Sequence, residues 1–170
     1  MSVRYDRTMR LFAAVPVAAP VKLQLHAGLE HLRTGGWFHR WVHPDDYHIT
    51  LKFLGETPPH QAAAVQNELR LAAAGCPPFT LTAGPVGSFG PPDAPTVCWA
   101  GVGGDLETLC RLQREVESRL AVLGFAPESR PYTPHITLAR KAKAATRERL
   151  RAVALPPVEA MTWRADEIVL

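Results

Sequence analysis

One tetrapeptide occurs twice in the chain, and the two copies lie about half the chain length apart. His-Ile-Thr-Leu stands at residues 48–51 and again at 135–138, an offset of 87 in a chain of 170 residues. A proline precedes each histidine by four residues, at Pro44 and at Pro131. A repeated motif with a repeated flank indicates duplication of a whole structural unit rather than chance. We therefore expect the chain to fold as two related halves.

Both halves are expected to follow the same order of strand, helix, proline-bearing loop and motif strand. At the offset of 87, the apolar stretch 11–15 aligns with the apolar stretch 98–102. Each half then has apolar residues at helical spacing. They are Leu25, Leu29 and Leu32 in the first half and Leu109, Leu112, Val116, Leu120 and Leu123 in the second. The pattern predicts an α+β, bilobal, duplicated fold: two pseudo-symmetric sheet lobes with outer helices around a central groove.

The remaining segments are expected to complete one continuous domain. Propensity and breaker residues predict a helix at 59–74, short strands at 79–83 and 85–89, a helix at 146–153 and a strand at 163–170. Gly124 is expected to end the second-half helix. No stretch is rich enough in glycine and serine to separate domains. Residues 1–170 are thus predicted to form a single two-lobed domain behind a loose lead-in at 1–8.

Composition excludes several classes of protein. With 46% hydrophobic and 21% charged residues, the chain is typical of a globular protein and not of a disordered one. No apolar run reaches the ~20 residues that cross a bilayer, so we expect no membrane partner. Three scattered cysteines suit free thiols in a reducing cytoplasm, where we expect a monomer. The stretch 11–19 faintly resembles a signal peptide, but Pro16 and Pro20 favour a first core strand.

Positive charge is concentrated in one segment. The formal net charge is +3, yet residues 130–151 hold seven basic side chains and one acidic one. The basic residues are Arg130, Arg140, Lys141, Lys143, Arg147, Arg149 and Arg151. Such a cluster is typical of phosphate binding. For the last three arginines, a solvated helix face explains the pattern equally well.

The repeated motif has the period of a β-strand, in which alternate side chains share one face. His48 and Thr50 would then project to one side, and His135 and Thr137 would do the same in the other half. Pseudo-twofold symmetry would bring both pairs to one central cleft. Imidazole titrates near neutral pH, so one histidine can act as a base while the other acts as an acid.

In-line displacement at phosphorus uses such a pair, a base for the attacking oxygen and an acid for the leaving oxygen. The two threonines can donate hydrogen bonds to the non-bridging oxygens. Arg130 and Arg140 bracket the second motif and can offset the charge that develops there. The predicted site needs neither a metal nor another cofactor if the substrate is an activated phosphodiester with its own leaving group.

Structural alternatives exist for each of these residues. A single His-x-Thr is usually a polar surface pair, and only the duplication favours a functional interpretation. His39 and His43 have the spacing of zinc ligands on a helix, but the extended pattern around them disfavours a helix. Phe53 lies two residues after Leu51, so alternation favours a place in the core. A twist or bulge at the strand end would instead turn it toward a base.

The two motifs resemble those of the two-histidine phosphoesterase superfamily. More narrowly, the chain resembles the bacterial and archaeal RNA 2′,3′-cyclic phosphodiesterases, also called 2′-5′ RNA ligases, from Met9 onward. The similarity lies in the segments 10–13, 41–44, 48–56, 79–81, 87–89, 97–102, 124–125 and 130–140. Members of that family commonly continue for a further strand beyond the point that corresponds to Leu170. The resemblance therefore defines the catalytic pair better than it defines the affinity for substrate.

This resemblance implies metal-independent opening of a ribonucleoside or RNA 2′,3′-cyclic phosphate to the 2′-phosphate, with no cofactor. It implies that His48 donates a proton to the departing 3′ oxygen and that His135 activates water. Thr50, Thr137 and Arg140 would bind the phosphate, and Phe53 would lie against the base. A 5′-hydroxyl in place of water would give 2′-5′ ligation without ATP.

Two other functions remain open from the sequence. Another cyclic phosphodiester, such as ADP-ribose 1″,2″-cyclic phosphate, would suit the same pair, because the histidines address only the phosphate. A non-catalytic module that binds RNA or nucleotides is the second alternative. The presence of both histidines and both threonines argues against it.

Overall fold

Seven strands form one antiparallel sheet that both halves of the chain share. The computed structural model describes residues 7–143 and 146–170. The strands are β1 (Met9–Pro16), β2 (Phe38–Trp41), β3 (His48–Thr57), β4 (Phe79–Phe89), β5 (Val97–Gly104), β6 (His135–Ala142) and β7 (Thr162–Ala165). Their order is β1-β3-β6-β5-β4-β7, and β2 pairs with β6. The two motif strands, β3 and β6, are therefore neighbours at the centre of the sheet.

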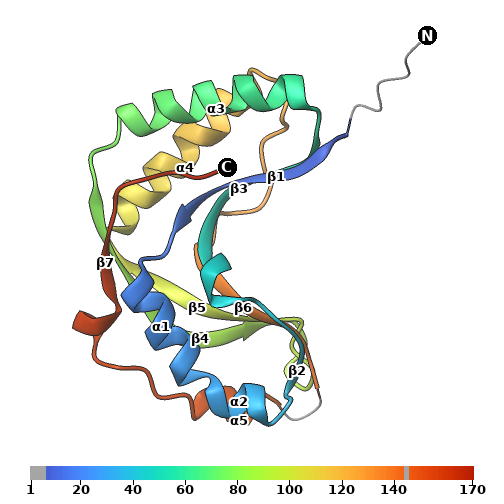
Figure 1. Ribbon diagram of the computed structural model, residues 1–170, viewed down its shortest axis with the longest axis vertical. Helices are drawn as coiled ribbons and strands as arrows, with labels where there is room; N and C mark the ends of the chain where they lie inside the picture. The colour runs from blue at the N-terminus through green and yellow to red at the C-terminus, as the bar shows by residue number, and fades with distance from the viewer. Residues whose placement is uncertain (1–6, 144–145) are drawn as a thin grey trace.

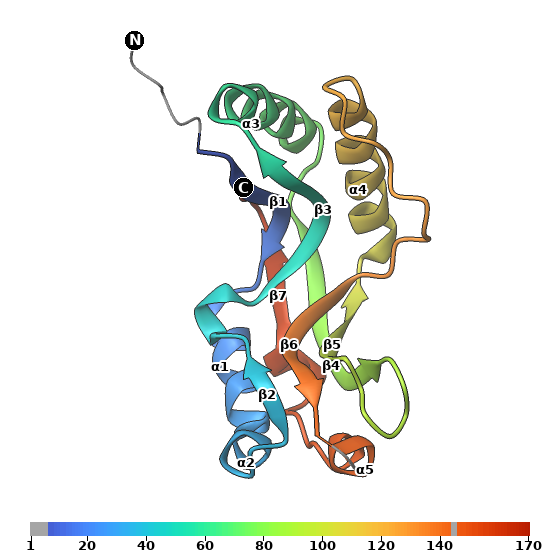
Figure 2. The ribbon, with the colours of Figure 1, turned by 90° about the vertical axis from the view of Figure 1, so that its right-hand side faces the viewer.

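The helices gather at the two ends of this sheet (Figure 1). They are α1 (Ala19–Gly28), α2 (Glu30–Thr34), α3 (Pro59–Ala74), α4 (Leu106–Ala121) and α5 (Thr146–Arg151), with 3-10 turns η1 (Pro44–Asp46) and η2 (Val158–Met161). Figure 2 shows β3 and β6 crossing the middle of one face, with α3 and α4 at one end and α1, α2 and α5 at the other. No helix of the described residues is both long and apolar enough to span a bilayer.

The predicted apolar stripes lie in the core, although Leu29 separates α1 from α2, and Leu123 follows the end of α4 and is only partly buried. Leu25, Leu29 and Leu32 are fully buried, as are Leu109 and Leu120 of α4. Burial of each such side chain contributes about 1.5–3 kcal/mol, which explains why these helices stay on the sheet. Within the described residues, the core of one half is continuous with the core of the other.

The two motif strands meet at equivalent residues. Ile49 of β3 pairs with Ile136 of β6 in antiparallel orientation, and both side chains are fully buried. Each isoleucine is the counterpart of the other in the repeat, which is the arrangement that a twofold axis between the strands requires. The predicted α+β, pseudo-symmetric architecture is confirmed, with both halves joined in one sheet.

A β-bulge interrupts β3 at the end of the first motif. Thr50 pairs with Ala14, whereas Lys52 pairs with Ala13, so Leu51 is the extra residue. Leu51 and Lys52 are consequently both buried, although they are consecutive. A bulge shifts the alternation of the side chains that follow it by one face, in β3 as far as a second register shift between Phe53 and Gly55.

The same bulge interrupts β6 at the equivalent place. Thr137 pairs with Trp99, whereas Ala139 pairs with Cys98, so Leu138 is the extra residue. Cys98 is thus the structural counterpart of Ala13, an offset of 85 rather than 87. The predicted alignment of the first strands was wrong by two residues, a shift that leaves each side chain on its expected face.

Other predicted boundaries need correction. The two short strands expected around Gly84-Pro85 are one strand, β4, with a cis peptide bond there and a register shift between Ala83 and Val86. The last strand is shorter than expected, because among the described residues beyond β7 only Val169 forms a bridge, to Ala14. Most of the predicted lead-in at 1–8 lies outside the described residues.

Candidate active site

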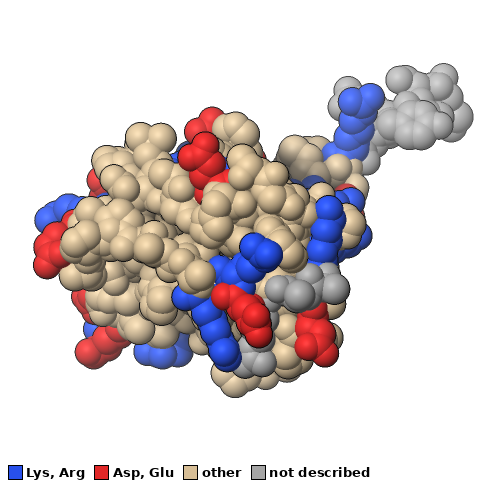
Figure 3. All heavy atoms as spheres, turned by 90° about the horizontal axis from the view of Figure 1, so that it is seen from below, with Lys and Arg blue, Asp and Glu red and all other residues tan. Residues whose placement is uncertain are grey.

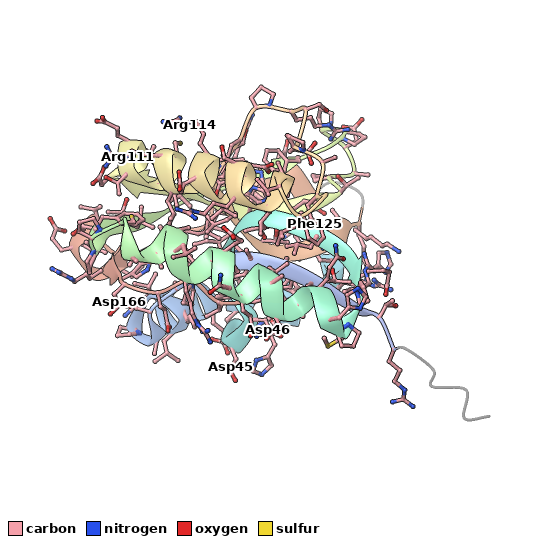
Figure 4. All side chains as sticks on the ribbon, turned by 90° about the horizontal axis from the view of Figure 1, so that it is seen from above. Asp45, Asp46, Arg111, Arg114, Phe125 and Asp166 are labelled. Carbon is pink, nitrogen blue, oxygen red and sulfur yellow. The ribbon has the colours of Figure 1, made fainter. Side chains whose placement is uncertain are left out.

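His48 begins β3 and is separated by Tyr47 from the turn η1, in which Asp45 and Asp46 lie side by side (Figure 4). Its Nδ1 lies 2.6 Å from the carbonyl oxygen of Asp46. A carbonyl can only accept a hydrogen bond, so Nδ1 carries the proton in this contact. Nε2 is left to act as acid or base, and it lies 3.1 Å from Oγ1 of Thr50. The ring is half-buried, hence both oriented and accessible.

His135 is held in the same way at the start of β6. Its Nδ1 lies 2.8 Å from the carbonyl oxygen of Thr133, again two residues upstream. The same reasoning makes Nδ1 the donor and leaves Nε2 for proton transfer. The fold therefore gives both histidines one tautomer by one device, a carbonyl at the end of the loop before each motif.

An aromatic ring contacts each of these imidazoles, with a different geometry in each half. Phe12 of β1 stacks on His48, with ring centroids 4.6 Å apart and planes at 26°. Phe89 of β4 meets His135 at 5.1 Å and 84°, an edge-to-face contact. Both aromatic residues were missed by the sequence analysis, because no local pattern links them with the motifs.

The two threonines share the sheet face of the histidines, as expected. Thr50 and Thr137 are half-buried, and only Thr50 is bonded to the histidine of its own motif among the described residues. Tyr132 donates a hydrogen bond of 2.7 Å to the carbonyl oxygen of Thr50. Burial raises the pKa of this phenol, so the hydroxyl stays a donor at neutral pH. The loop before the second motif thus holds β3, the strand of the first motif, in place.

A buried ion pair supports the first motif from behind. The ammonium group of Lys52 lies 2.9 Å from the carboxylate of Glu117 on α4 and 2.8 Å from the carbonyl oxygen of Ala126. The Lys52 side chain is only 4% exposed. The bulge at Leu51 explains this inward position, since regular alternation would have placed Lys52 on the outer face.

The same bulge overturns the core position that alternation favoured for Phe53. The side chain is 69% exposed. It lies opposite Phe12 in the sheet, with ring centroids 6.1 Å apart, so it shares the face of His48. In the second half, Arg140 holds the equivalent position and is also exposed. One repeat therefore presents an aromatic side chain where the other presents a cation.

The described side chains of the predicted basic segment lie in different structural surroundings. Arg130 is exposed in the loop before β6, and no ion pair or hydrogen bond among the described residues joins it to the motif. The guanidinium of Arg149 lies 3.8 Å above the ring of Trp37, a structural contact. Figure 3 views the end that carries α2 and α5, where the described basic side chains stand beside acidic ones. The side chain of Arg147 lies outside the described residues.

The residues considered for zinc lie in extended structure, as expected. His39 belongs to β2, and Nδ1 of His43 accepts a hydrogen bond of 3.2 Å from the backbone N–H of Asp45. Over residues 7–143 and 146–170, no three His, Cys, Asp or Glu side chains come close enough together to hold a metal ion.

Comparison with known proteins identifies the family. Residues 20–170 match the model of the 2′-5′ RNA ligase superfamily. An RNA 2′,3′-cyclic phosphodiesterase of Geobacillus stearothermophilus is 35% identical over 159 residues, which are 94% of this chain and 50% of that protein. The chain thus spans about half the length of this relative.

Solved structures agree with this match. E. coli LigT in its apo form has a TM-score of 0.72 and 28% identity over 95% of this chain and 86% of that one. LigT in complex with 3′-AMP has a TM-score of 0.70 and 29% identity with the same coverage. The resemblance seen in the sequence is confirmed: this chain belongs to the 2′-5′ RNA ligase superfamily.

Proposed function

We propose that the chain hydrolyses the 2′,3′-cyclic phosphate of ribonucleosides and RNA ends to the 2′-phosphate. The observation that carries this proposal is the matched pair of histidines. Each donates from Nδ1 to a backbone carbonyl, and each keeps Nε2 for proton transfer on one sheet face. The name of the G. stearothermophilus relative and the 3′-AMP bound to LigT support the choice of substrate.

In the proposed reaction, Nε2 of His135 accepts a proton from water as the water oxygen attacks phosphorus. The bond between phosphorus and O3′ breaks, and Nε2 of His48 gives its proton to O3′. The products are a 3′-hydroxyl and a 2′-phosphate. Thr50 and Thr137 donate to the non-bridging oxygens, and Arg140 offsets their growing charge. When a 5′-hydroxyl replaces water, the same steps form a 2′-5′ linkage without ATP.

The contact with Phe12 supports the acid role of His48. The stacked ring presents its negative face to the imidazole, and such a face attracts a cation. His48 also has a threonine hydroxyl beside Nε2, which can relay or orient the proton. His135 meets a ring in edge-to-face geometry and has no such hydroxyl contact among the described residues. The two halves therefore suit different proton-transfer roles.

The exposed ring of Phe53 is proposed to stack on the base beside the cyclic phosphate. Its 69% exposure leaves the ring available, and its place opposite Phe12 sets it close to His48. Base stacking on an aromatic side chain contributes about 1–3 kcal/mol and tolerates any base.

We also propose that residues 1–170 act as one two-lobed domain, as a monomer in the cytoplasm. The shared seven-stranded sheet and the continuous core of the described residues support the single domain. Three free cysteines support a reducing compartment. Cys98 is buried, which raises the pKa of its thiol to about 12 and keeps it protonated.

The test is product identification. The purified protein is incubated with adenosine 2′,3′-cyclic phosphate in the presence and absence of EDTA, with His48→Ala as the inactive control. We expect the 2′-phosphate as product, with equal rates in both conditions. A 3′-phosphate, or activity that EDTA abolishes and zinc restores, would contradict the proposed chemistry. Turnover of ADP-ribose 1″,2″-cyclic phosphate alone would assign the site to that substrate.

A further inference from the structure

Four side chains form a row across the sheet next to the proposed active site. Arg40 of β2 pairs with Arg140 of β6, Arg140 pairs with Val97 of β5, and Val97 pairs with Phe89 of β4. Directly opposed residues of a sheet project from the same face. At about 4.8 Å between strands, the row is roughly 14 Å long.

This row lies on the face that carries the second motif. In β5, alternate residues Val97, Trp99 and Gly101 share one face, and they pair with Arg140, Thr137 and His135 respectively. The row also touches the reaction site at one end, because the ring of Phe89 contacts His135 at 5.1 Å.

The two arginines of the row stand directly opposite each other in neighbouring strands. Both are exposed, and neither lies within ion-pairing distance of a carboxylate in the described part of the chain. Arg119, by contrast, is paired with Glu68 and Glu115. Like charges directly opposite each other destabilise a sheet. A bound anion between Arg40 and Arg140 would remove this repulsion.

The aromatic end of the row suits a nucleobase. Phe89 is 38% exposed, and its inner edge is fixed by Trp99, with ring centroids 5.3 Å apart. A held but exposed ring is a typical stacking platform for an unpaired base. The two arginines suit a phosphate, Val97 suits the sugar, and the ring of Phe89 suits a base.

We propose that this row binds a second nucleotide, the one that precedes the cyclic phosphate in an RNA strand. Arg40 and Arg140 flank the internucleotide phosphate, with Arg140 also facing the cyclic phosphate, and Phe89 stacks on the neighbouring base. This inference rests on the proposed function, and it makes the preferred substrate an RNA end of at least two nucleotides. Arg40 becomes a residue that determines substrate length.

Three substrates separate the contributions: adenosine 2′,3′-cyclic phosphate, the dinucleotide ApA with a 2′,3′-cyclic phosphate, and the same dinucleotide with a neutral methylphosphonate linkage. We expect the natural chain to prefer the charged dinucleotide over the neutral one about ten-fold in kcat/KM, since only the charged linkage can make charge-assisted contacts with the arginines. The preference should shrink as salt rises.

The variant Arg40→Gln should reduce the preference for the charged dinucleotide about ten-fold and leave the discrimination between the neutral dinucleotide and the mononucleotide unchanged. Arg40→Lys should keep most of the preference, because lysine also binds phosphate. Arg164→Gln is the matched control, an exposed arginine of β7 that pairs with Thr80, at the other end of β4 from Phe89, and should change neither ratio.

Equal loss on all three substrates would mean that Arg40 serves the fold or the cyclic phosphate itself, and would overturn the proposal. No loss on any substrate would overturn it as well. If the natural chain hydrolyses none of the three, the proposed function fails, and calorimetric binding of ApA 2′-phosphate still decides the subsite. That ligand should bind Arg40→Gln about ten-fold more weakly, and equal affinity would contradict the proposal.

Discussion

The two copies of the repeated motif are alike where they hold the imidazoles and different where they face a ligand. Each copy begins with a histidine held by a carbonyl two residues upstream, and each contains a bulge at its leucine. After the bulge, the first copy has Lys52 and Phe53, whereas the second has Ala139 and Arg140. Duplication thus preserved the backbone contact that orients each imidazole, while a few substitutions gave the halves different surroundings for ligands.

The proposal that both imidazoles take part in catalysis is tested by removing each of them in turn. His48→Ala and His135→Ala should each lower kcat by at least about 10², because each removes one partner in proton transfer. Thermal unfolding should show that both variants keep the fold. His60→Ala, an exposed histidine at the start of α3, is the matched control and should keep full activity. Near-full activity of either site variant would contradict the symmetric pair.

The second difference between the halves is the buried ion pair of Lys52, which has no counterpart at Ala139 in the second half. Lys52→Ala should lower the free energy of unfolding by about 3 kcal/mol, because it leaves the carboxylate of Glu117 without its buried partner. Glu115→Gln, which breaks the more exposed pair with Arg119, should cost less than about 0.5 kcal/mol. Chemical denaturation measures both. Equal small effects would show that the ion pair does not support the first motif.

The smallest effect concerns the basic segment of the second half. Arg149→Gln should lower the free energy of unfolding by about 0.5–1 kcal/mol, because it removes the cation above Trp37. The hydrolysis of mononucleotide and dinucleotide should change in parallel, if at all. A selective loss on the dinucleotide would instead assign Arg149 to RNA binding.

The repeat made the global arrangement predictable. Two motifs of strand period at a fixed offset were sufficient to predict the pseudo-twofold symmetry and the shared face of His48 and Thr50. Apolar residues at helical spacing were sufficient to predict the stripe of α4. Each of these features depends on local periodicity, which a sequence displays directly.

What the sequence did not reveal depends on which residues of different strands lie opposite each other. The bulge at Leu51 moves Lys52 inward and Phe53 outward, yet nothing in the local composition distinguishes a bulged leucine from a regular one. Arg40 gained significance only when β2 paired with β6 and placed it opposite Arg140. Register is set by the whole sheet, so the ligand-facing differences between the halves could not be predicted from the segments alone.

The central claim is that one backbone device fixes the same tautomer in both histidines. Nitrogen-15 NMR of the imidazoles at a pH where they are neutral measures this directly, because protonated and unprotonated ring nitrogens have distinct shifts. We predict the Nδ1–H form for both His48 and His135, with Nε2 unprotonated, whereas His60 on the surface should report a mixture. An Nε2–H form at either position would contradict the account, since that imidazole could not donate to its carbonyl or present a free Nε2.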